Sequence, residues 1–162
     1  MGASWIASVR SLILRELRFW KWRVKDGLDR QAQRKRTELQ PGLRRRVPAS
    51  SLYAIHHELG HVPIHSTPHY RFARALIEGT QSSKEKNEWR AYIAAQHGIS
   101  FSALDVWEMK FRYLVRASRK SRTLFLIKVR QESGALIILD GFHRAAIMAA
   151  RGRNATIACF IM

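Results

Sequence analysis

Apolar and polar residues follow the periods of strand, helix and strand towards the end of the chain. Residues 136–139 form a short apolar run, β-branched at its centre, which is typical of a buried strand. The run ends at Asp140-Gly141, a pair that favours a turn. Residues 145–150 are strong helix formers, and residues 155–161 are strand-like again. This pattern predicts a strand, a tight turn, a helix and a second strand in direct succession.

The middle of the chain shows the spacing of amphipathic helices. Thr67 is a good N-cap and Pro68 a favoured first residue, so we predict a helix that begins here and is ended by Gly79. Residues 80–87 are polar and are predicted to form a loop. Residues 88–96 carry aromatic and aliphatic side chains at helical spacing, which predicts a second helix.

A third and longer helix is predicted to open at a capping box formed by Ser102 and Asp105. Its expected core face consists of Leu104, Trp107, Phe111, Leu114 and Val115. Residues 117–122 are predicted to be a basic link, and weak alternation over residues 123–129 indicates a strand. The turn residues 132–134 would join that strand to the following one as a hairpin.

Together with a short first strand near residues 47–52, these elements predict an α/β fold. We expect a small mixed sheet covered by helices, in a domain that spans residues 46–162. Pro41-Gly42 marks its boundary with a helical extension and linker over residues 1–45.

The extension is predicted to contain a basic amphipathic helix over residues 4–35. Its apolar stripe consists of Ile6, Val9, Ile13, Leu17, Trp20 and Val24, and it is widened by Trp5, Leu12, Phe19 and Trp22. The other side is almost wholly basic. Such a helix suits an anionic membrane surface or a phosphate backbone, and it equally suits packing on the domain with its basic residues solvated. We expect the rest of the chain to fold without it.

The charge balance narrows the choice of partners. The chain has 29 Lys and Arg residues against 12 Asp and Glu, a net charge of +17, which implies nucleic acid, nucleotides, acidic lipid or an acidic protein as partner. The single cysteine, Cys159, excludes a disulfide framework and favours a reducing compartment. Because neither a transmembrane run nor a signal peptide is recognisable, we expect a cytoplasmic protein, with peripheral membrane association as an option.

A His-rich window contains an H-E-x-x-H sequence over residues 57–61, a literal match to the zinc-peptidase motif. That motif needs its two histidines one turn apart on a helix. Gly60 inside the motif and Pro63 just after it disfavour a helix. We therefore predict no metal site here and keep a zinc hydrolase as a minor alternative.

The predicted turn at residues 140–144 carries most of the candidate chemistry. A helix start offers unpaired N–H groups and a partial positive charge that bind anions, and Gly141 would let a phosphate approach the backbone. Arg144 could clamp a phosphate, whereas Asp140 could hold a metal ion or accept a proton. His143 could act as an acid or base, or donate a hydrogen bond. In the alternative interpretation, Asp140 only caps the helix and the basic residues are solvated.

The segment DGFHRAAIMAARG resembles the signature of the ParB/sulfiredoxin-like superfamily, in which a strand is followed by D-G-x-H-R and an Ala-rich helix that ends near glycine. The matching residues are Asp140, Gly141, His143, Arg144 and Gly152. The resemblance is firm over residues 135–162 and looser from residue 46 onward. It implies a small α/β domain that binds a nucleotide of the ATP, ADP or CTP class with Mg²⁺, with this turn at the phosphates.

The resemblance also assigns residues to the site. It implies Asp140 and His143 as catalytic residues, and Gly141, Arg144, Arg71 and His69 as nucleotide- or phosphate-binding residues. Arg71 is the closest match to an early arginine that faces the nucleotide in ParB-like domains. Phosphoryl transfer to a small molecule, or nucleotide hydrolysis, is the activity that the resemblance allows.

The known activities of individual superfamily members fit this sequence less well than nucleotide binding does. Sulfiredoxins carry a catalytic cysteine directly before the His-Arg pair, where this chain has Phe142. Chromosome-partitioning members continue into a helix-turn-helix domain, whereas this sequence stops at Met162. Serine-kinase members carry an early catalytic glutamate, for which Glu58 is the candidate. The rival class is a non-catalytic basic adaptor that binds nucleic acid or acidic membrane through residues 4–46.

Overall fold

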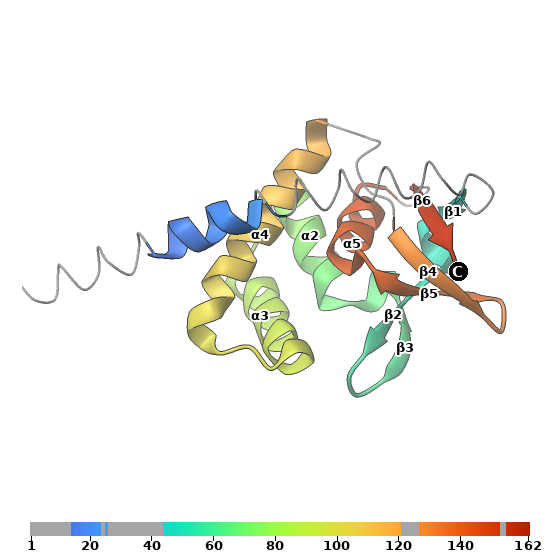
Figure 1. The fold of residues 1–162 in the computed structure, drawn as a ribbon, viewed down its shortest axis with the longest axis horizontal. Helices are drawn as coiled ribbons and strands as arrows, with labels where there is room; N and C mark the ends of the chain where they lie inside the picture. Colours follow the sequence, from blue (N-terminus) through green and yellow to red (C-terminus); the bar gives the residue numbers. More distant parts are fainter. Residues whose placement is uncertain (1–13, 24, 26–43, 121–126, 153–154) are drawn as a thin grey trace, which may run out of the picture.

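The computed structural model describes residues 14–23, 25, 44–120, 127–152 and 155–162. In Figure 1 these residues form a six-stranded sheet at one end and a group of helices at the other. The strands are β1 (Arg44–Pro48), β2 (Leu52–His56), β3 (Gly60–Pro63), β4 (Ile127–Glu132), β5 (Ala135–Asp140) and β6 (Thr156–Ile161). The helices are α2 (Pro68–Glu78), α3 (Ser83–His97), α4 (Phe101–Lys120) and α5 (Phe142–Ala150), with 3-10 turns η2 (Ala49–Ser51) and η3 (Ile64–Ser66). A further helix, which we call the N-terminal helix, covers residues 14–23.

The sheet is mixed and has the strand order β1-β6-β4-β5-β2-β3. The β1–β6, β4–β5 and β2–β3 pairs are antiparallel, whereas the β4–β6 and β2–β5 pairs are parallel. Parallel neighbours need a crossover: α2, α3 and α4 lie on the connection between β2 and β5, and β5 with α5 forms the connection between β4 and β6. The prediction of an α/β protein with a mixed sheet and covering helices is confirmed at this level.

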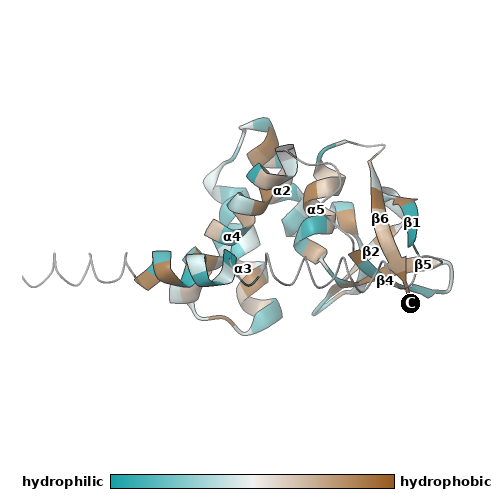
Figure 2. Ribbon diagram, turned by 45° about the horizontal axis from the view of Figure 1, so that its top comes forward, coloured by the Kyte–Doolittle hydropathy of each residue, from teal (hydrophilic) through white to brown (hydrophobic). Residues whose placement is uncertain are grey.

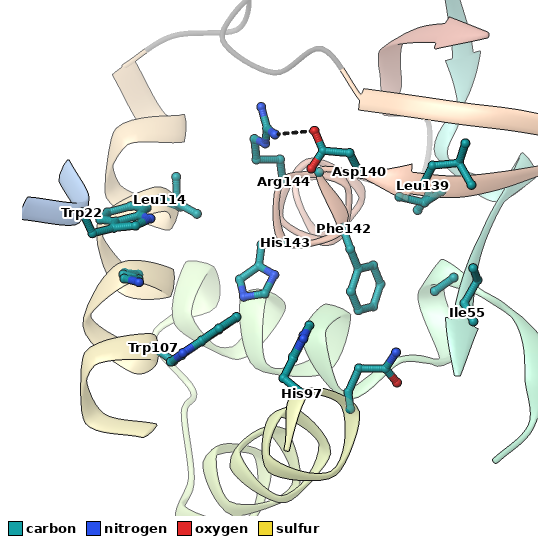
Figure 3. A pocket seen from close by; sticks show the side chains of 15 residues that line it. Trp22, Ile55, His97, Trp107, Leu114, Leu139, Asp140, Phe142, His143 and Arg144 are labelled. Carbon is teal, nitrogen blue, oxygen red and sulfur yellow. Dashed lines mark ion pairs between the residues drawn. The ribbon is translucent and has the colours of Figure 1, made fainter. Parts of the chain in front are cut away.

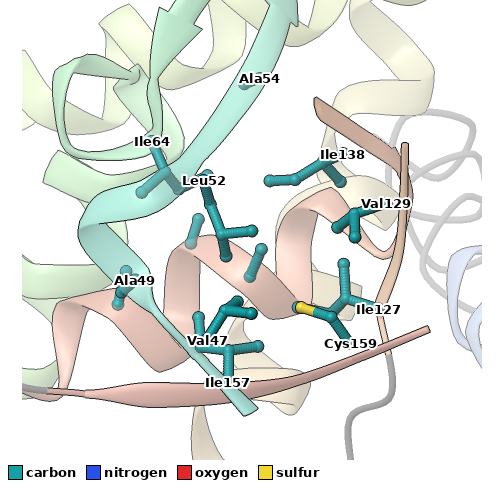
Figure 4. Close-up of a cluster of buried hydrophobic side chains, with 13 residues drawn as sticks. Val47, Ala49, Leu52, Ala54, Ile64, Ile127, Val129, Ile138, Ile157 and Cys159 are labelled. Atoms are coloured by element: carbon teal, nitrogen blue, oxygen red, sulfur yellow. The ribbon is translucent and has the colours of Figure 1, made fainter. Parts of the chain in front are cut away.

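Helix α5 lies between two hydrophobic clusters and joins them. Its small residues Ala145, Ala146 and Ala149 face the sheet cluster, which Figure 4 shows around Leu52 and Ile157. The other cluster fills the space among α2, α3 and α4, and its largest buried side chains are Phe72, Trp89, Ile93, Leu104 and Phe111. Ile147 of α5 reaches this second cluster. The first turn of α5 is therefore held from both sides, which fixes the position of the candidate site.

An ion-pair network ties α3 to α4. Buried Glu108 accepts hydrogen bonds from Arg90 (3.0 Å) and Arg112 (2.9 Å). Burial alone would raise the pKa of Glu108, but these hydrogen bonds and the nearby Lys86 outweigh it, so that the pKa lies below its usual value. The network fixes the two helices whose side chains form one wall of the candidate site.

The predicted helices of the middle of the chain are largely confirmed. Helix α2 has Thr67 as its N-cap, whose side chain accepts a hydrogen bond from the Tyr70 backbone, and it ends at Gly79 in the left-handed conformation. Helix α3 begins earlier than predicted, because Ser82 and Glu85 form a capping box within the supposed polar loop. Likewise α4 begins before the predicted capping box and continues through residues 117–120, so the predicted basic link is wrong there.

Several strands, and the end of α5, differ from the prediction. The β2–β3 hairpin in the His-rich window was not predicted. The strand expected near residues 47–52 is divided in the structure into the end of β1, the turn η2 and the start of β2. The predicted strand over residues 123–129 begins at Ile127 in the structure, and residues 123–126 lie outside the described residues. The β4–β5 hairpin is confirmed, with its turn at Ser133-Gly134. The C-cap of α5 is Arg151, one residue before the glycine near which the helix was expected to end.

The N-terminal helix packs on α4 through Phe19 and Trp22, which the sequence pattern placed beside the main apolar stripe and not within it. The rings of Phe19 and Trp22 each lie 5.9 Å from that of Tyr113, whereas Leu17 and Trp20 of the predicted stripe are exposed. The remaining stripe residues, Ile6, Val9, Ile13 and Val24, lie outside the described residues. Across the part of the chain that the structure describes, no helix combines the length and apolar character that a bilayer crossing requires.

Candidate functional site

A pocket of about 440 Å³ opens where the first turn of α5 faces α3, α4 and the N-terminal helix. Residues 140–144 line one side, and Figure 3 shows His97, Trp107 and Trp22 on the other. Lys110 of α4 completes this second wall. The turn that the sequence singled out thus lies in a pocket, and its partners come from elements far away in the chain.

Gly141 forms the corner between β5 and α5. Its φ of +87° is a left-handed conformation that favours glycine, and it serves as the N-cap of α5. A Cβ built here would lie 3.4 Å from both Arg144 Nε and Ile127 Cγ1. Because no side chain caps the helix, the interpretation of Asp140 as a simple N-cap is wrong.

Asp140 and Arg144 form an ion pair across the first turn of α5. Arg144 Nη2 lies 3.5 Å from Asp140 Oδ2, as Figure 3 shows. The two partners differ in exposure: the Arg144 side chain is 15% exposed and that of Asp140 is 55% exposed. Arg144 is therefore held in a fixed place at the pocket, and Asp140 presents its carboxylate at the opening.

His143 projects from α5 to the inner side of the pocket and packs against His69 of α2, with ring centroids 4.6 Å apart. Burial, together with the positive charge of His97, Arg144 and Lys110, lowers the pKa of His143 to about 3. His143 is therefore a neutral imidazole near pH 7, with one N–H donor and one acceptor nitrogen. A neutral ring of this kind can hydrogen-bond a ligand but is a poor general base.

Two indoles and a lysine form the wall opposite the turn. Lys110 Nζ lies 5.4 Å from the Trp22 ring and 5.5 Å from the Trp107 ring, both within cation–π range. The ring of His97 stacks on Trp107 at 4.9 Å. Sequence reasoning missed Lys110 and treated Trp107 only as a core residue. Their spacing of three on one helix places both on the same side, which is the signal that could have grouped them.

The two other predicted phosphate-binding residues lie apart from the pocket wall. His69 is fully buried behind His143, and its ring is enclosed by aromatic side chains. Arg71 donates to the Ser66 carbonyl oxygen at 3.0 Å and to Glu88 at 3.2 Å, and it is not among the pocket-lining residues. The structure thus brings Asp140, Gly141, His143 and Arg144 together and leaves Arg71 on another surface.

The H-E-x-x-H sequence lies on the β2–β3 hairpin, which confirms the prediction that it is not helical. Among the described residues, His56, His57 and Glu58 are the group whose ligand atoms lie close enough for a metal ion, within 4.8 Å of one another. However, His56 Nδ1 accepts hydrogen bonds from the backbone N–H groups of Glu58 and Leu59. This leaves the proton of neutral His56 on Nε2, so neither nitrogen offers a lone pair to a metal.

No family model, curated protein or solved structure matches this chain. The assignment of the site therefore depends on its own geometry. The pocket combines two cationic side chains, a helix start, a neutral imidazole, an exposed carboxylate and two indoles. This set can hold an anion beside a flat ring, and the volume lies in the range of pockets for small ligands.

Proposed function

We propose that the pocket binds a nucleoside phosphate. The observation that carries this proposal is the meeting of Arg144, Lys110 and the first turn of α5 with the indoles of Trp22 and Trp107 around one pocket. Cationic side chains and helix starts bind phosphate oxygens, and aromatic side chains stack on bases. The D-G-x-H-R resemblance to the ParB/sulfiredoxin-like superfamily points to the same ligand class.

In this proposal each residue at the turn has a separate task. Arg144, aligned by Asp140, contacts the phosphates, and the backbone N–H groups that follow Gly141 add their partial positive charge. His143 donates or accepts a hydrogen bond as a neutral ring. Trp22 and Trp107 line the wall opposite the turn, against which the base would lie. In this division Arg144 and the start of α5 lie on one wall, and the indoles with Lys110 lie on the other.

Magnesium fits the site through Asp140. Mg²⁺ is usually bound by one or two carboxylates together with substrate phosphates, and Asp140 is the carboxylate among the pocket-lining residues. When bound, the metal would supply neutralisation of phosphate charge. The exposed carboxylate of Asp140 could also accept a proton from an attacking hydroxyl, so phosphoryl transfer or nucleotide hydrolysis is the reaction we propose to test after binding.

The test compares Arg144→Ala with Arg71→Ala by calorimetry against ATP, ADP and CTP in the presence of Mg²⁺. We expect Arg144→Ala to weaken binding by about ten- to a hundred-fold, since a charge-assisted hydrogen bond contributes roughly 1.5–3 kcal/mol. Arg71→Ala removes an equal charge away from the pocket and should bind like the wild type. Circular dichroism of both variants shows whether the fold is retained.

Two results would contradict the proposal. Equal affinity in the wild type and a folded Arg144→Ala variant would remove the phosphate clamp from the pocket. Equal weakening in both variants would show that overall positive charge, rather than the pocket, attracts the nucleotide. A steep loss of binding with added salt would point the same way, because exposed charges are screened more than those in a pocket.

A further inference from the structure

The N-terminal helix has a second apolar face, whose side chains are exposed in the described structure. Leu14, Leu17 and Trp20 follow one another at steps of three and are 46%, 52% and 55% exposed. Phe19 and Trp22, which pack on Tyr113, lie on the opposite side of the same helix. In Figure 2 hydrophobic colour reaches the end of this helix, at the side of the molecule away from the sheet. A folded domain thus presents a row of large apolar side chains to its surroundings.

Basic residues border this apolar row. Arg18, Lys21, Arg23 and Lys25 are all exposed, and the sequence from residue 14 to residue 25 contains five basic residues against one acid, Glu16. The Arg23 guanidinium lies 5.0 Å from the Trp20 ring, so one of these cations lies directly beside the apolar face. The helix therefore has an aromatic side on the domain and an outward side on which large apolar side chains lie among basic residues.

We propose that this outward face docks the protein on an anionic membrane surface. Leucine and tryptophan side chains insert at the boundary between headgroups and acyl chains, while bordering lysines and arginines contact anionic headgroups. A phosphate backbone would use the cations but would leave the leucines in water. The excess of positive charge over the whole chain, +17, complements an acidic surface and opposes docking on a second copy of this chain.

The domain contacts leave this face available. Because Phe19 and Trp22 hold the helix on α4, docking needs neither unfolding nor release of the helix from the domain. The anchor belongs to the same helix that contributes Trp22 to the pocket wall. Membrane binding is nevertheless independent of whether the pocket accepts a nucleotide, since the two use opposite sides of the helix.

The experiment measures flotation of the full chain with phosphatidylcholine vesicles that contain or lack phosphatidylserine. We expect binding to the acidic vesicles alone, weakened by about tenfold in Leu17→Gln, because burial of one leucine contributes at least this much. Leu59→Gln is the matched control, since Leu59 is 69% exposed on the β2–β3 hairpin. It should bind like the wild type.

A second pair of variants tests the charges. Lys21→Gln with Lys25→Gln should weaken vesicle binding by about thirty-fold, or about five-fold for each residue near the surface. Lys84→Gln with Arg116→Gln removes the same charge from exposed positions on α3 and α4 and should have little effect. All four sites are exposed, so unchanged melting temperatures are expected throughout.

Several outcomes would overturn the proposal. They are equal binding to vesicles with and without phosphatidylserine, or wild-type binding by Leu17→Gln. Concentration-dependent dimers that Leu17→Gln abolishes, without vesicle binding, would assign the face to a second copy of the chain. Binding of a duplex oligonucleotide that depends on Lys21 and Lys25 but not on Leu17, again without vesicle binding, would assign it to nucleic acid.

Discussion

At the scale of single residues, His69 is the side chain whose surroundings differ most from what its chemistry requires. It is fully buried, and neither ring nitrogen has a hydrogen-bond partner in the described structure. Its ring centroid lies 4.3 Å from that of Phe142 and 5.2 Å from that of Tyr92. Burial, together with the charges of His143 and His97, lowers the pKa of His69 well below its usual value. His69 thus acts as part of an aromatic core that supports His143 from behind.

This burial predicts that acid destabilises the protein. The folded-state pKa values of His69 and His143 lie below the unfolded value of about 6.5, so above that pH neither contributes. As the pH falls below about 6.5, the unfolded chain binds protons that the folded chain does not, and stability falls by up to about 1.4 kcal/mol per pH unit for each histidine. For His143 this loss continues to about pH 3. Denaturant unfolding as a function of pH measures this slope.

The variant His69→Leu separates the two histidines. It removes two unpaired buried nitrogens and keeps an apolar side chain, so stability at neutral pH should be retained or raised. The slope of the free energy of unfolding against pH in the acid range should decrease by the contribution of one histidine. An unchanged pH slope would show that His69 is protonated in the folded state or paired in solution.

At the scale of elements, the junction between β5 and α5 determines the geometry of the site. Ala135–Asp140 form a strand in the middle of the sheet, and the chain then turns at Gly141 directly into a helix. This turn brings the end of β5 next to the start of α5, so that Asp140 and Arg144 can form an ion pair across it. A positive φ is what makes so short a connection feasible.

We therefore expect Gly141→Ala to destabilise the protein by about 1–2 kcal/mol, the usual cost of a left-handed conformation for a residue with Cβ. The added Cβ would also press on Arg144 and weaken ligand binding. Gly152→Ala is the matched control, because its φ is not positive and its Cβ would meet nothing within 4 Å. Thermal unfolding of the two variants checks this, and equal stabilities would contradict the assigned role of Gly141.

At the scale of the whole molecule, the N-terminal helix contacts both the helical cluster and the pocket. Trp22 contacts the helical cluster and lines the pocket, but the buried residues of both hydrophobic clusters come from residues 47–159. The domain core is therefore complete without the helix, whereas the pocket is not. We therefore expect the domain to fold without the helix but to bind its ligand less tightly.

A chain that begins at residue 40 should fold with an α/β circular dichroism spectrum and a modestly lower melting temperature. It should bind the pocket ligand less tightly, because Trp22 no longer closes one wall, and it should not bind acidic vesicles. Trp22→Ala in the full chain is the control, since it should weaken ligand binding and leave vesicle binding intact. Insolubility, or a melting point far below that of the full chain, would show that the helix is part of the core.

Local signals in the sequence determined the elements that need only their own residues. Thr67, Pro68 and Gly79 set the bounds of α2, because caps and helix ends depend on hydrogen bonds within one turn. The β4–β5 hairpin and the corner at Asp140-Gly141 were predictable for the same reason. Each of these features is encoded within a few consecutive residues.

Tertiary structure alone decided which faces meet. The sequence could not show that Arg71 turns to Glu88, that His69 is enclosed, or that Lys110 and Trp107 face the turn, because each depends on neighbours from other elements. The N-terminal helix carries apolar residues on two sides, and only the position of Tyr113 on α4 selects the side that is packed. Helical period fixes where side chains lie around a helix, but the surface of the packing partner determines which of them are buried.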